Sequence, residues 1–210
     1  MVFLQILNNF DRIHLEMVLT AIVLIIFGFL LGSIPFSILL GRLFRHTDIR
    51  TYGDGNPGAA NAFKAGGWKT GVPALLLDFL KGAVPVYLAG NHFQISGAWM
   101  IPIAIAPIAG HAYSPFLHFK GGKAITTTFG VWAGLTLYQA PLLLGLFCAT
   151  FYMLLESSAW ASMLSFLGFF VIFQLFHFDT HLLLIGALNL VILLHKHYPE
   201  LRLPISLRKR

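Results

Sequence analysis

Seven apolar runs, separated by short polar connections, make up most of the chain. They fall at residues 17–44, 71–90, 97–112, 124–139, 141–156, 158–176 and 181–195. A helix needs about 20 apolar residues to cross the hydrocarbon core of a bilayer, and the runs come close to this length or exceed it. The pattern therefore predicts an all-α membrane protein with about seven transmembrane helices, folded as a single integral membrane domain over residues 1–210.

The composition agrees with this membrane interpretation. Hydrophobic residues make up 57% of the chain and charged residues only 10%, whereas a soluble domain carries about 25% charged residues. The single cysteine, Cys148, lies inside an apolar run, which excludes an internal disulfide and a CxxC metal site. These features argue against an ordinary soluble enzyme and favour an integral membrane protein.

Lysine and arginine residues accumulate on alternate connections. The connection after the first run, the third connection and the C-terminal tail are basic, and the remaining connections carry no lysine or arginine. Cytoplasmic loops of membrane proteins are enriched in these residues. The distribution therefore predicts an N-terminus outside the cell, a C-terminus in the cytoplasm, and polar segments at the cytoplasmic face. It also accounts for the net charge of +6, so no nucleic-acid partner is expected.

The first polar segment contains the sequence GDGNPGAAN at residues 53–61. Glycine lets backbone N–H groups approach an anion closely, and successive N–H groups form an anion-binding nest. Asparagine side chains add donors and acceptors, and Arg50 lies just upstream. We interpret the segment as a phosphate-binding loop. The alternative is a plain surface turn, because Gly, Asn and Pro are also ordinary turn residues.

Upstream of this loop, the sequence GSIPFS interrupts the first apolar run. Pro35 removes a backbone hydrogen bond, and the residue before a proline resists the helical conformation. Irregular backbone at membrane depth is tolerated where it lines a polar cavity. Ser33 and Ser37 are four residues apart, so they share one helical face beside the break.

The second polar segment places Lys120, Gly121, Gly122 and Lys123 directly before the fourth apolar run. Two lysines around a flexible Gly-Gly at the start of a helix suit a phosphate group, because the helix N-terminus adds free N–H groups and a positive dipole. The segment is not a Walker A loop, since Ala124 follows Lys123. The alternative is that both lysines only mark the cytoplasmic side of the membrane.

Asp78 and Lys81 lie well inside the second apolar run. They are three residues apart on one helical face and can form an ion pair. Ionisable groups at this depth are costly unless they are paired or hydrated. The pair is therefore either a structural salt bridge or part of the wall of a cavity that the polar loops close.

Metal-binding and acid–base motifs are missing from the sequence. The nine histidines form no cluster with acids along the chain, and no HExxH motif occurs, so no metal or cofactor site is expected. No histidine has an acid at a sequence spacing that suits a general base.

Four blocks of sequence together resemble a known family. These blocks are GSIPFSILLGRLF, DIRTYGDGNPGAANAFKAGG, DFLKG and GHAYSPFLHFKGGKAITTTFG, within about residues 30–130. They are similar to the bacterial acyl-phosphate-dependent glycerol-3-phosphate acyltransferases. The resemblance implies a multi-pass protein of the bacterial cytoplasmic (inner) membrane with seven spans. It also implies transfer of a fatty acyl chain from acyl-phosphate to the 1-hydroxyl of glycerol 3-phosphate, which gives lysophosphatidic acid for phospholipid synthesis without a cofactor.

The resemblance carries roles over to particular positions. It makes Ser33, Arg50, His111 and Lys123 the catalytic candidates. It assigns substrate and phosphate binding to Gly53, Gly55, Asn56, Gly58, Asn61, Ser114, Lys120, Gly121, Gly122 and His195. On this interpretation Arg50 and Lys123 converge at the inner leaflet on two phosphoryl groups, and the substrate phosphate itself takes the proton from the attacking hydroxyl.

Three places depart from the family pattern. Asp54 stands where the family usually has serine, and Ala124 begins an altered stretch after the second lysine. In the last motif His195 is kept, but Tyr198 and Pro199 stand at the Asn-Ile positions. These departures leave open a paralogue that binds phosphorylated lipid without turnover or uses another acceptor. The broken spans and glycine-rich loops leave open a second alternative, a small transporter of organic anions.

Overall fold

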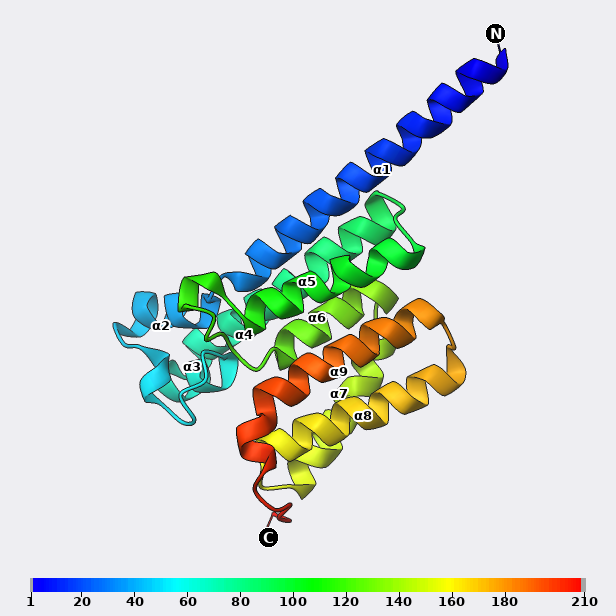
Figure 1. The fold of residues 1–210 in the computed structure, drawn as a ribbon. Helices are drawn as coiled ribbons and strands as arrows, with labels where there is room; N and C mark the ends of the chain where they lie inside the picture. The colour runs from blue at the N-terminus through cyan, green and yellow to red at the C-terminus, as the bar shows by residue number, and fades with distance from the viewer. Residues whose placement is uncertain (1, 209–210) are drawn as a thin grey trace.

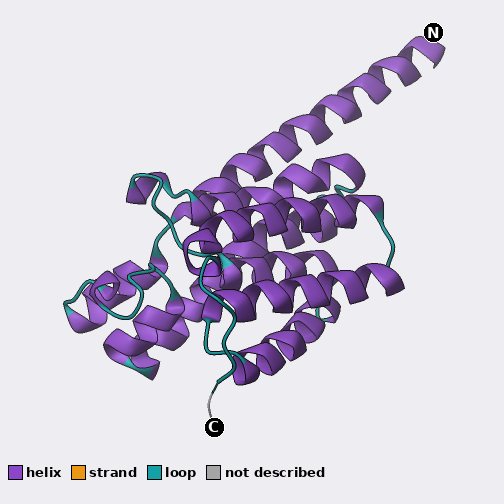
Figure 2. Cartoon of the chain, turned by 60° about the horizontal axis from the view of Figure 1, so that its bottom comes forward, coloured by secondary structure: helices purple, strands orange, loops and turns teal. Residues whose placement is uncertain are grey.

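The computed structural model describes residues 2–208, and the side chains of residues 14–208. Among these residues the regular structure is helical (Figure 2), and the only β-type pairing is an isolated bridge between Leu155 and Leu207. The α-helices are α1 (Val2–Ser33), α2 (Phe36–Arg45), α3 (Ala59–Gly66), α4 (Trp68–Tyr87), α5 (Met100–Ala112), α6 (Ile125–Thr136), α7 (Gln139–Leu154), α8 (Ser158–Phe176) and α9 (Thr180–Leu201). Short helical turns complete the chain: η1 (Ile49–Thr51), η2 (Leu88–His92), η3 (Gly97–Trp99) and η4 (Pro115–Leu117).

Each predicted apolar run forms a helix, and the all-α membrane class is confirmed. In the part of the chain that the structure describes, five segments are long and apolar enough to cross a membrane. They are His14–Arg45, Trp68–His92, Gly97–Leu117, Ser158–Phe176 and Thr180–Leu201. The runs predicted at 124–139 and 141–156 form α6, with 12 residues, and α7, with 16 residues. The span count of seven and the orientation therefore stay predictions.

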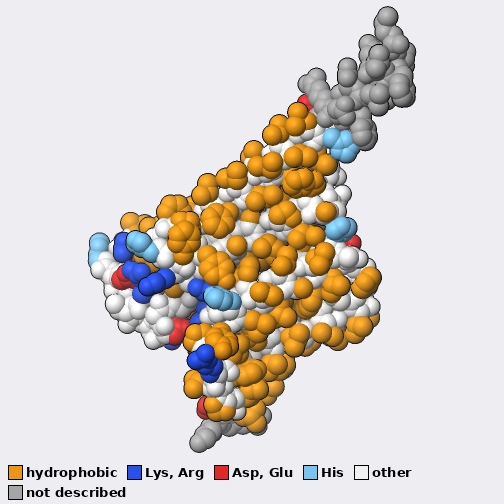
Figure 3. Space-filling model, in the orientation of Figure 1, with side chains coloured by type: hydrophobic (Ala, Val, Ile, Leu, Met, Phe, Trp, Pro, Cys, Tyr) orange, Lys and Arg blue, Asp and Glu red, His pale blue; other side chains and the backbone are white. Residues whose placement is uncertain are grey.

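The helices form a bundle from which α1 extends at its N-terminal end (Figure 1). α1 packs along α5, α4 packs against α6, and α7 packs against α8. α2, α3 and their connecting loops lie together at one side, beside the break after α1. In Figure 3 the Lys and Arg side chains gather around this side and near the C-terminal end, and hydrophobic side chains cover most of the remaining face. This separation is typical of a protein whose bundle lies in lipid and whose loops lie in water.

Glycine allows the closest helix contacts. A Cβ atom on Gly130 of α6 would lie 1.9 Å from the carbonyl oxygen of Phe79 in α4, and one on Gly82 of α4 would lie 2.3 Å from the carbonyl oxygen of Thr127 in α6. Small residues at such crossings let backbones approach closely, which is how helices gain packing energy in lipid. The α4–α6 pair therefore depends on these two positions.

An aromatic cluster holds the second half of the bundle together. The Trp132 ring, fully buried on α6, meets Phe166, Phe169 and Phe173 of α8 at centroid distances of 6.4, 5.0 and 5.7 Å. Its indole N–H donates to Oδ1 of Asn189 on α9 at 3.3 Å, so the polar end of the ring is satisfied inside the core. These contacts fix α6, α8 and α9 relative to one another.

Candidate functional site

The helix break predicted at Pro35 separates α1 from α2. Backbone carbonyls at the break are bound by side chains from other segments: Ser114 Oγ, in the connection after α5, donates to the Ser33 carbonyl at 2.6 Å, and Lys81 Nζ of α4 donates to the Ile34 carbonyl at 3.0 Å. The Ser33 hydroxyl donates back to the Phe29 carbonyl at 2.7 Å. Ser33 and Ser114 are both buried, and their hydroxyls stabilise the break in this structure.

Asp78 and Lys81 form a buried ion pair beside this break. Lys81 Nζ lies 2.7 Å from Asp78 Oδ1, and each side chain is 2% exposed. Ser37 Oγ donates to Asp78 Oδ2 at 2.9 Å, and His111 Nδ1 lies 3.9 Å from Asp78 Oδ1. The sequence spacing indicates no acid for any histidine, and the structure places Asp78 near His111, beyond hydrogen-bond distance. Because Asp78 and His111 lie on different helices, their proximity is invisible in the sequence spacing.

The glycine loop folds around one carboxylate. Asp54 Oδ1 accepts hydrogen bonds from the Asn56 backbone N–H at 3.1 Å and from Asn61 Nδ2 at 2.8 Å. Gly53 and Gly55 adopt left-handed φ values of 58° and 73°, which residues with a side chain rarely adopt. The loop is thus bonded largely to itself, with Asn61 buried inside it and Asp54 Oδ2 left to face another segment.

That segment is the Lys-Gly-Gly-Lys loop before α6. A Cβ atom on Gly121 would lie 2.0 Å from the His111 carbonyl oxygen, and one on Gly122 would lie 2.3 Å from His111 Nε2. Both glycines are therefore required for the loop to pack on His111. Lys196 Nζ of α9 donates to the Gly121 carbonyl at 2.8 Å and holds the loop from the other side. Lys120, in contrast, is exposed.

Lys123 lies between two carboxylates. Its Nζ is 2.6 Å from Asp54 Oδ2 and 2.5 Å from Oε1 of Glu200, in the last turn of α9. Burial alone would raise the pKa of Asp54, but hydrogen bonds from Lys123, Asn56 and Asn61 outweigh it and hold that pKa at about 2. Burial would lower the pKa of Lys123, and its bonds to Asp54 and Glu200 raise it instead. Asp54 and Lys123 are therefore both charged at neutral pH.

A polar cavity of about 360 Å³ opens between these groups. Of the predicted site residues it contacts Asn56, Gly58, Asp78, His111 and Lys123, together with Asp54. Four polar residues that the sequence analysis missed also line it: Tyr152, Ser158, Ser162 and His197. Ser158 and Ser162 are four residues apart on α8, and this spacing is the only sequence signal that pointed to them.

Arg50 lies on a different cavity. That second cavity, of about 510 Å³, is also lined by Arg42, His118 and the break residues Ile34 and Pro35. Arg50 is held there by Asp48, whose Oδ2 accepts from Nη2 at 2.6 Å. Arg50 and Lys123 therefore line different cavities in this structure and do not converge on one, contrary to the expectation from the sequence. Arg50 is bound by Asp48 of its own segment, and Lys123 is bound by Asp54 and Glu200 of facing segments.

His195 lies away from both cavities. Its ring packs against Tyr113, with a centroid distance of 5.8 Å, and it lines neither the polar cavity nor the cavity at Arg50. Within the described residues no three His, Cys, Asp or Glu side chains are grouped to hold a metal ion. The polar cavity itself is lined by charged, hydroxyl and imidazole groups.

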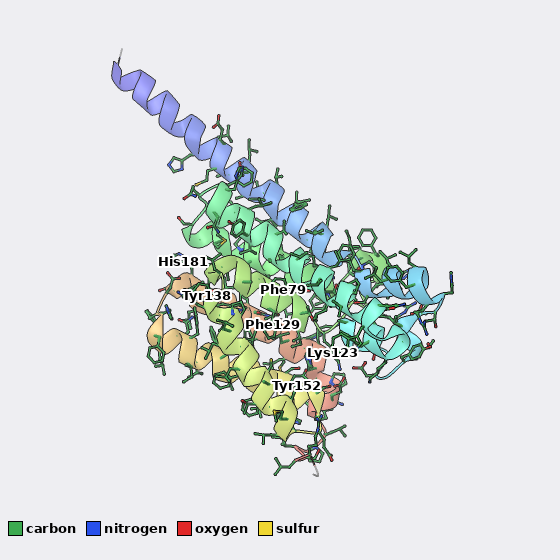
Figure 4. All side chains as sticks on the ribbon, turned by 180° about the vertical axis from the view of Figure 1, so that it is seen from behind. Phe79, Lys123, Phe129, Tyr138, Tyr152 and His181 are labelled. Carbon is green, nitrogen blue, oxygen red and sulfur yellow. The ribbon has the colours of Figure 1, made fainter. Side chains whose placement is uncertain are left out.

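An apolar cavity of about 530 Å³ adjoins the polar one. Its walls are Leu75, Leu76, Phe79, Ile125, Thr126, Phe129, Cys148 and Tyr152, and four of these residues also line the polar cavity. In Figure 4, Lys123 and Tyr152 lie near one end of the bundle, and Phe79 and Phe129 lie further along it, towards Tyr138 and His181. A charged pocket that continues into an apolar one suits an amphipathic ligand with a polar head and a hydrocarbon tail.

The fold and the site together define a polytopic helical membrane protein with a charged pocket that continues into an apolar one. The family model "Glycerol-3-phosphate acyltransferase" matches residues 22–203. The chain therefore belongs to the glycerol-3-phosphate acyltransferase family, as its sequence blocks predict.

Individual relatives agree with this assignment. The chain is 43% identical over 123 residues to glycerol-3-phosphate acyltransferase 1 of Thermotoga maritima, a match that covers 58% of this chain and 60% of that one. It is 31% identical over 176 residues to the glycerol-3-phosphate acyltransferase of Fusobacterium nucleatum, covering 82% and 88%. The matches to the enzymes of Thermotoga maritima and Anaeromyxobacter dehalogenans thus span about 60% of those proteins' length.

Two crystal structures share the fold. Both are of PlsY (YgiH), an integral membrane glycerol 3-phosphate acyltransferase, in its glycerol 3-phosphate form and its lysophosphatidic acid form. The first superposes with a TM-score of 0.80 at 30% identity and the second with 0.79 at 28%. In both cases the match covers 87% of this chain and 90% of the other.

Proposed function

We propose that this protein transfers a fatty acyl group from acyl-phosphate to the 1-hydroxyl of glycerol 3-phosphate and so produces lysophosphatidic acid in the bacterial inner membrane. The observation that carries the proposal is the junction of the polar and apolar cavities, which share Leu75, Ile125, Thr126 and Tyr152. The acyl chain lies in the apolar cavity, which it enters sideways from the bilayer. The phosphoryl group then lies in the polar cavity beside Lys123.

The charge of the two substrates is the main obstacle that the site must overcome. Two like charges about 5 Å apart repel by roughly 3 kcal/mol at an effective dielectric of about 20. Lys123 in the polar cavity, with the loop N–H groups, offsets this repulsion. Arg50 does the same for a second phosphoryl group at the neighbouring cavity. Because acyl-phosphate is a mixed anhydride with a good leaving group, positioning and charge stabilisation supply most of the catalysis.

His111 is the proton acceptor that we propose for the attacking hydroxyl. It lines the polar cavity, retains 7% exposure, and has Nδ1 on the side of Asp78. The hydroxyl oxygen attacks the acyl carbonyl carbon, and its proton passes to the neutral imidazole. The bond from this carbon to the phosphate oxygen then breaks, and the proton follows to the departing inorganic phosphate. Direct transfer of the proton to the substrate phosphate is the competing route.

The reaction is tested with purified full-length protein, palmitoyl-phosphate and glycerol 3-phosphate. We expect release of inorganic phosphate and formation of lysophosphatidic acid in equal amounts, detected by a phosphate assay and by mass spectrometry. Palmitoyl-coenzyme A in place of palmitoyl-phosphate is expected to give no product. Absence of both products from palmitoyl-phosphate would overturn the proposal.

The end of α9 favours a second candidate function, binding of a phosphorylated lipid without turnover. Tyr198 is exposed and its ring stacks under the Arg202 guanidinium, 4.5 Å from the centroid, while Pro199 lies inside the last turns of the helix. Neither residue offers the amide that the family motif has there. Saturable binding of palmitoyl-phosphate without phosphate release distinguishes this candidate from the transferase.

A further inference from the structure

One ammonium group in the polar cavity is shared by two carboxylates from distant segments. Asp54 belongs to the glycine loop, Lys123 precedes α6, and Glu200 lies in the last turn of α9. We refer to these three residues as the Lys123 clamp. Its formal charge is −1, although Lys123 is the cation that the polar cavity offers to a phosphoryl group.

The clamp occupies the place that a substrate phosphate needs. An ammonium group has three N–H donors, and two of them point at Asp54 and Glu200. A phosphate oxygen bound to the third donor would lie close to both carboxylates, at a distance where like charges repel strongly. The side chain of Lys123 is only 15% exposed, so solvent screens this repulsion incompletely.

Asp54 has separable roles in the loop and in the clamp. Its Oδ1 accepts the hydrogen bonds from Asn56 and Asn61 that shape the loop, and its Oδ2 accepts from Lys123. Glu200 is 36% exposed and Asp54 is 44% exposed, so both carboxylates have room to swing into solvent. A ligand with enough affinity can therefore displace them without unfolding the loop.

We infer that Asp54 and Glu200 determine the specificity of the polar cavity for the charge of its ligand, by competing with the phosphoryl group for Lys123. This inference rests on the proposed function, in which a phosphoryl group lies beside Lys123. Repulsion grows with the charge of the ligand. The clamp therefore weakens binding of a dianionic phosphate monoester more than binding of a monoanionic phosphate diester.

The test compares binding of two ligands to the purified full-length protein in detergent micelles. Isothermal titration measures the Kd of glycerol 3-phosphate, a dianion, and of its monoanionic methyl ester. The variants are Asp54→Asn, which keeps the Oδ1 acceptor, Glu200→Gln, and the double variant. Glu156→Gln is the matched control, because it removes the same charge from an exposed position that does not line the polar cavity.

We expect each single variant to bind glycerol 3-phosphate about twofold to fivefold more tightly, because an ion pair of this exposure is worth up to about 1 kcal/mol, a factor of about five in Kd. The methyl ester should gain less, the double variant should exceed either single variant, and Glu156→Gln should match the wild type. Unchanged or weaker binding of glycerol 3-phosphate in Asp54→Asn and Glu200→Gln would overturn the inference, and so would absence of binding in every variant.

The activity assay separates this inference from the proposed function. If binding tightens in the variants but neither the wild type nor any variant releases phosphate from palmitoyl-phosphate, the inference stands and the transferase proposal fails. If the wild type is active and the two substitutions leave both Kd values unchanged, the transferase proposal stands and the inference fails. Glu200→Gln alone decides the matter if Asp54→Asn disturbs the loop, since Glu200 takes no part in the hydrogen bonds of that loop.

Discussion

The ammonium group of Lys81 donates to the backbone carbonyl of Ile34 at 3.0 Å and at the same time pairs with Asp78 on its own helix. The contact joins the middle of α4 to the break between α1 and α2. A freed carbonyl at membrane depth and a buried carboxylate thus share one cation. Because both would be costly without it, the break and the ion pair depend on each other.

Replacement of Lys81 by methionine should therefore destabilise the protein strongly. Removing one partner of a buried pair costs about 3–5 kcal/mol, and we expect the melting midpoint to fall by about 10 °C. The double variant Asp78→Asn/Lys81→Met leaves no unpaired charge and keeps an acceptor for Ser37. It should recover at least half of the lost midpoint in a thermal unfolding assay. A double variant no more stable than Lys81→Met would show that the charge balance is not the cause.

Lys123→Ala tests the site itself. It removes the cation of the polar cavity, and we expect the rate of phosphate release from palmitoyl-phosphate to fall about tenfold or more. Lys69→Ala is the matched control, because Lys69 is an exposed lysine on α4 that lines none of the three cavities. Equal rates in Lys123→Ala and the wild type would remove Lys123 from the site.

Arg50→Ala tests whether the second cavity belongs to the same site. Arg50 lies with Arg42 on a cavity next to the break, and its guanidinium is bound by Asp48. If that cavity holds the second phosphoryl group, the rate should fall about tenfold or more. The loss should appear mainly in the KM for one of the two substrates. A variant with the kinetic constants of the wild type would restrict the site to the polar cavity.

Much of the fold follows from the sequence because hydropathy acts locally. Each apolar run forms a helix. α1 ends at Ser33, because Pro35 has no backbone N–H to donate to the helix. The lengths of α6 and α7 were predicted less well. Leu137 has a positive φ of 57°, so the turn between them falls inside the run predicted at 124–139. Nothing in the hydropathy of these residues marks that turn.

The candidate site was only partly predictable, since its charges pair across the fold. Asp48 and Arg50 are two residues apart, so their pairing is a local contact within one segment. Asp54 and Lys123 are 69 residues apart, and their contact depends on how α3 and α6 pack. Tyr152 of α7 lines the same cavity, and Glu200 of α9 pairs with Lys123, only because the two helices end beside this site. Sequence reasoning therefore found the loops but not the partners.

The α4–α6 crossing predicts a second stability effect. In Gly130→Ala the new Cβ would meet the Phe79 carbonyl at 1.9 Å, and the backbone of neither helix can yield cheaply. Overpacking of this kind costs about 1–3 kcal/mol, so we expect a clear loss of thermal stability and a change in the adjoining apolar cavity.

Gly145→Ala in α7 is the matched control for this substitution. Its Cβ would find the nearest atom, Cε1 of Phe129, at an ordinary 3.9 Å. Because alanine is the better helix former by about 0.5–1 kcal/mol, this variant should be neutral or slightly more stable. Equal melting midpoints for the two variants would mean that the α4–α6 contact is looser than described.

The pKa of Asp54 predicts how stability responds to acid. In the folded protein this pKa is about 2, compared with an ordinary value of 3.8. A carboxyl group whose pKa is depressed by folding stabilises the folded state above its unfolded pKa, and this contribution is lost as the pH falls from about 4 towards 2. At near-neutral pH we therefore expect Asp54→Asn to melt below the wild type, by a modest amount because the side chain is partly exposed. The difference should shrink when unfolding is measured near pH 3.

Asp48, whose pKa is also about 2 because of its hydrogen bonds from Arg50, is present in both proteins and cancels in the comparison. A difference that stays constant from pH 7 to pH 3 would indicate that Asp54 stabilises the loop through its hydrogen bonds to Asn56 and Asn61 and not through its charge.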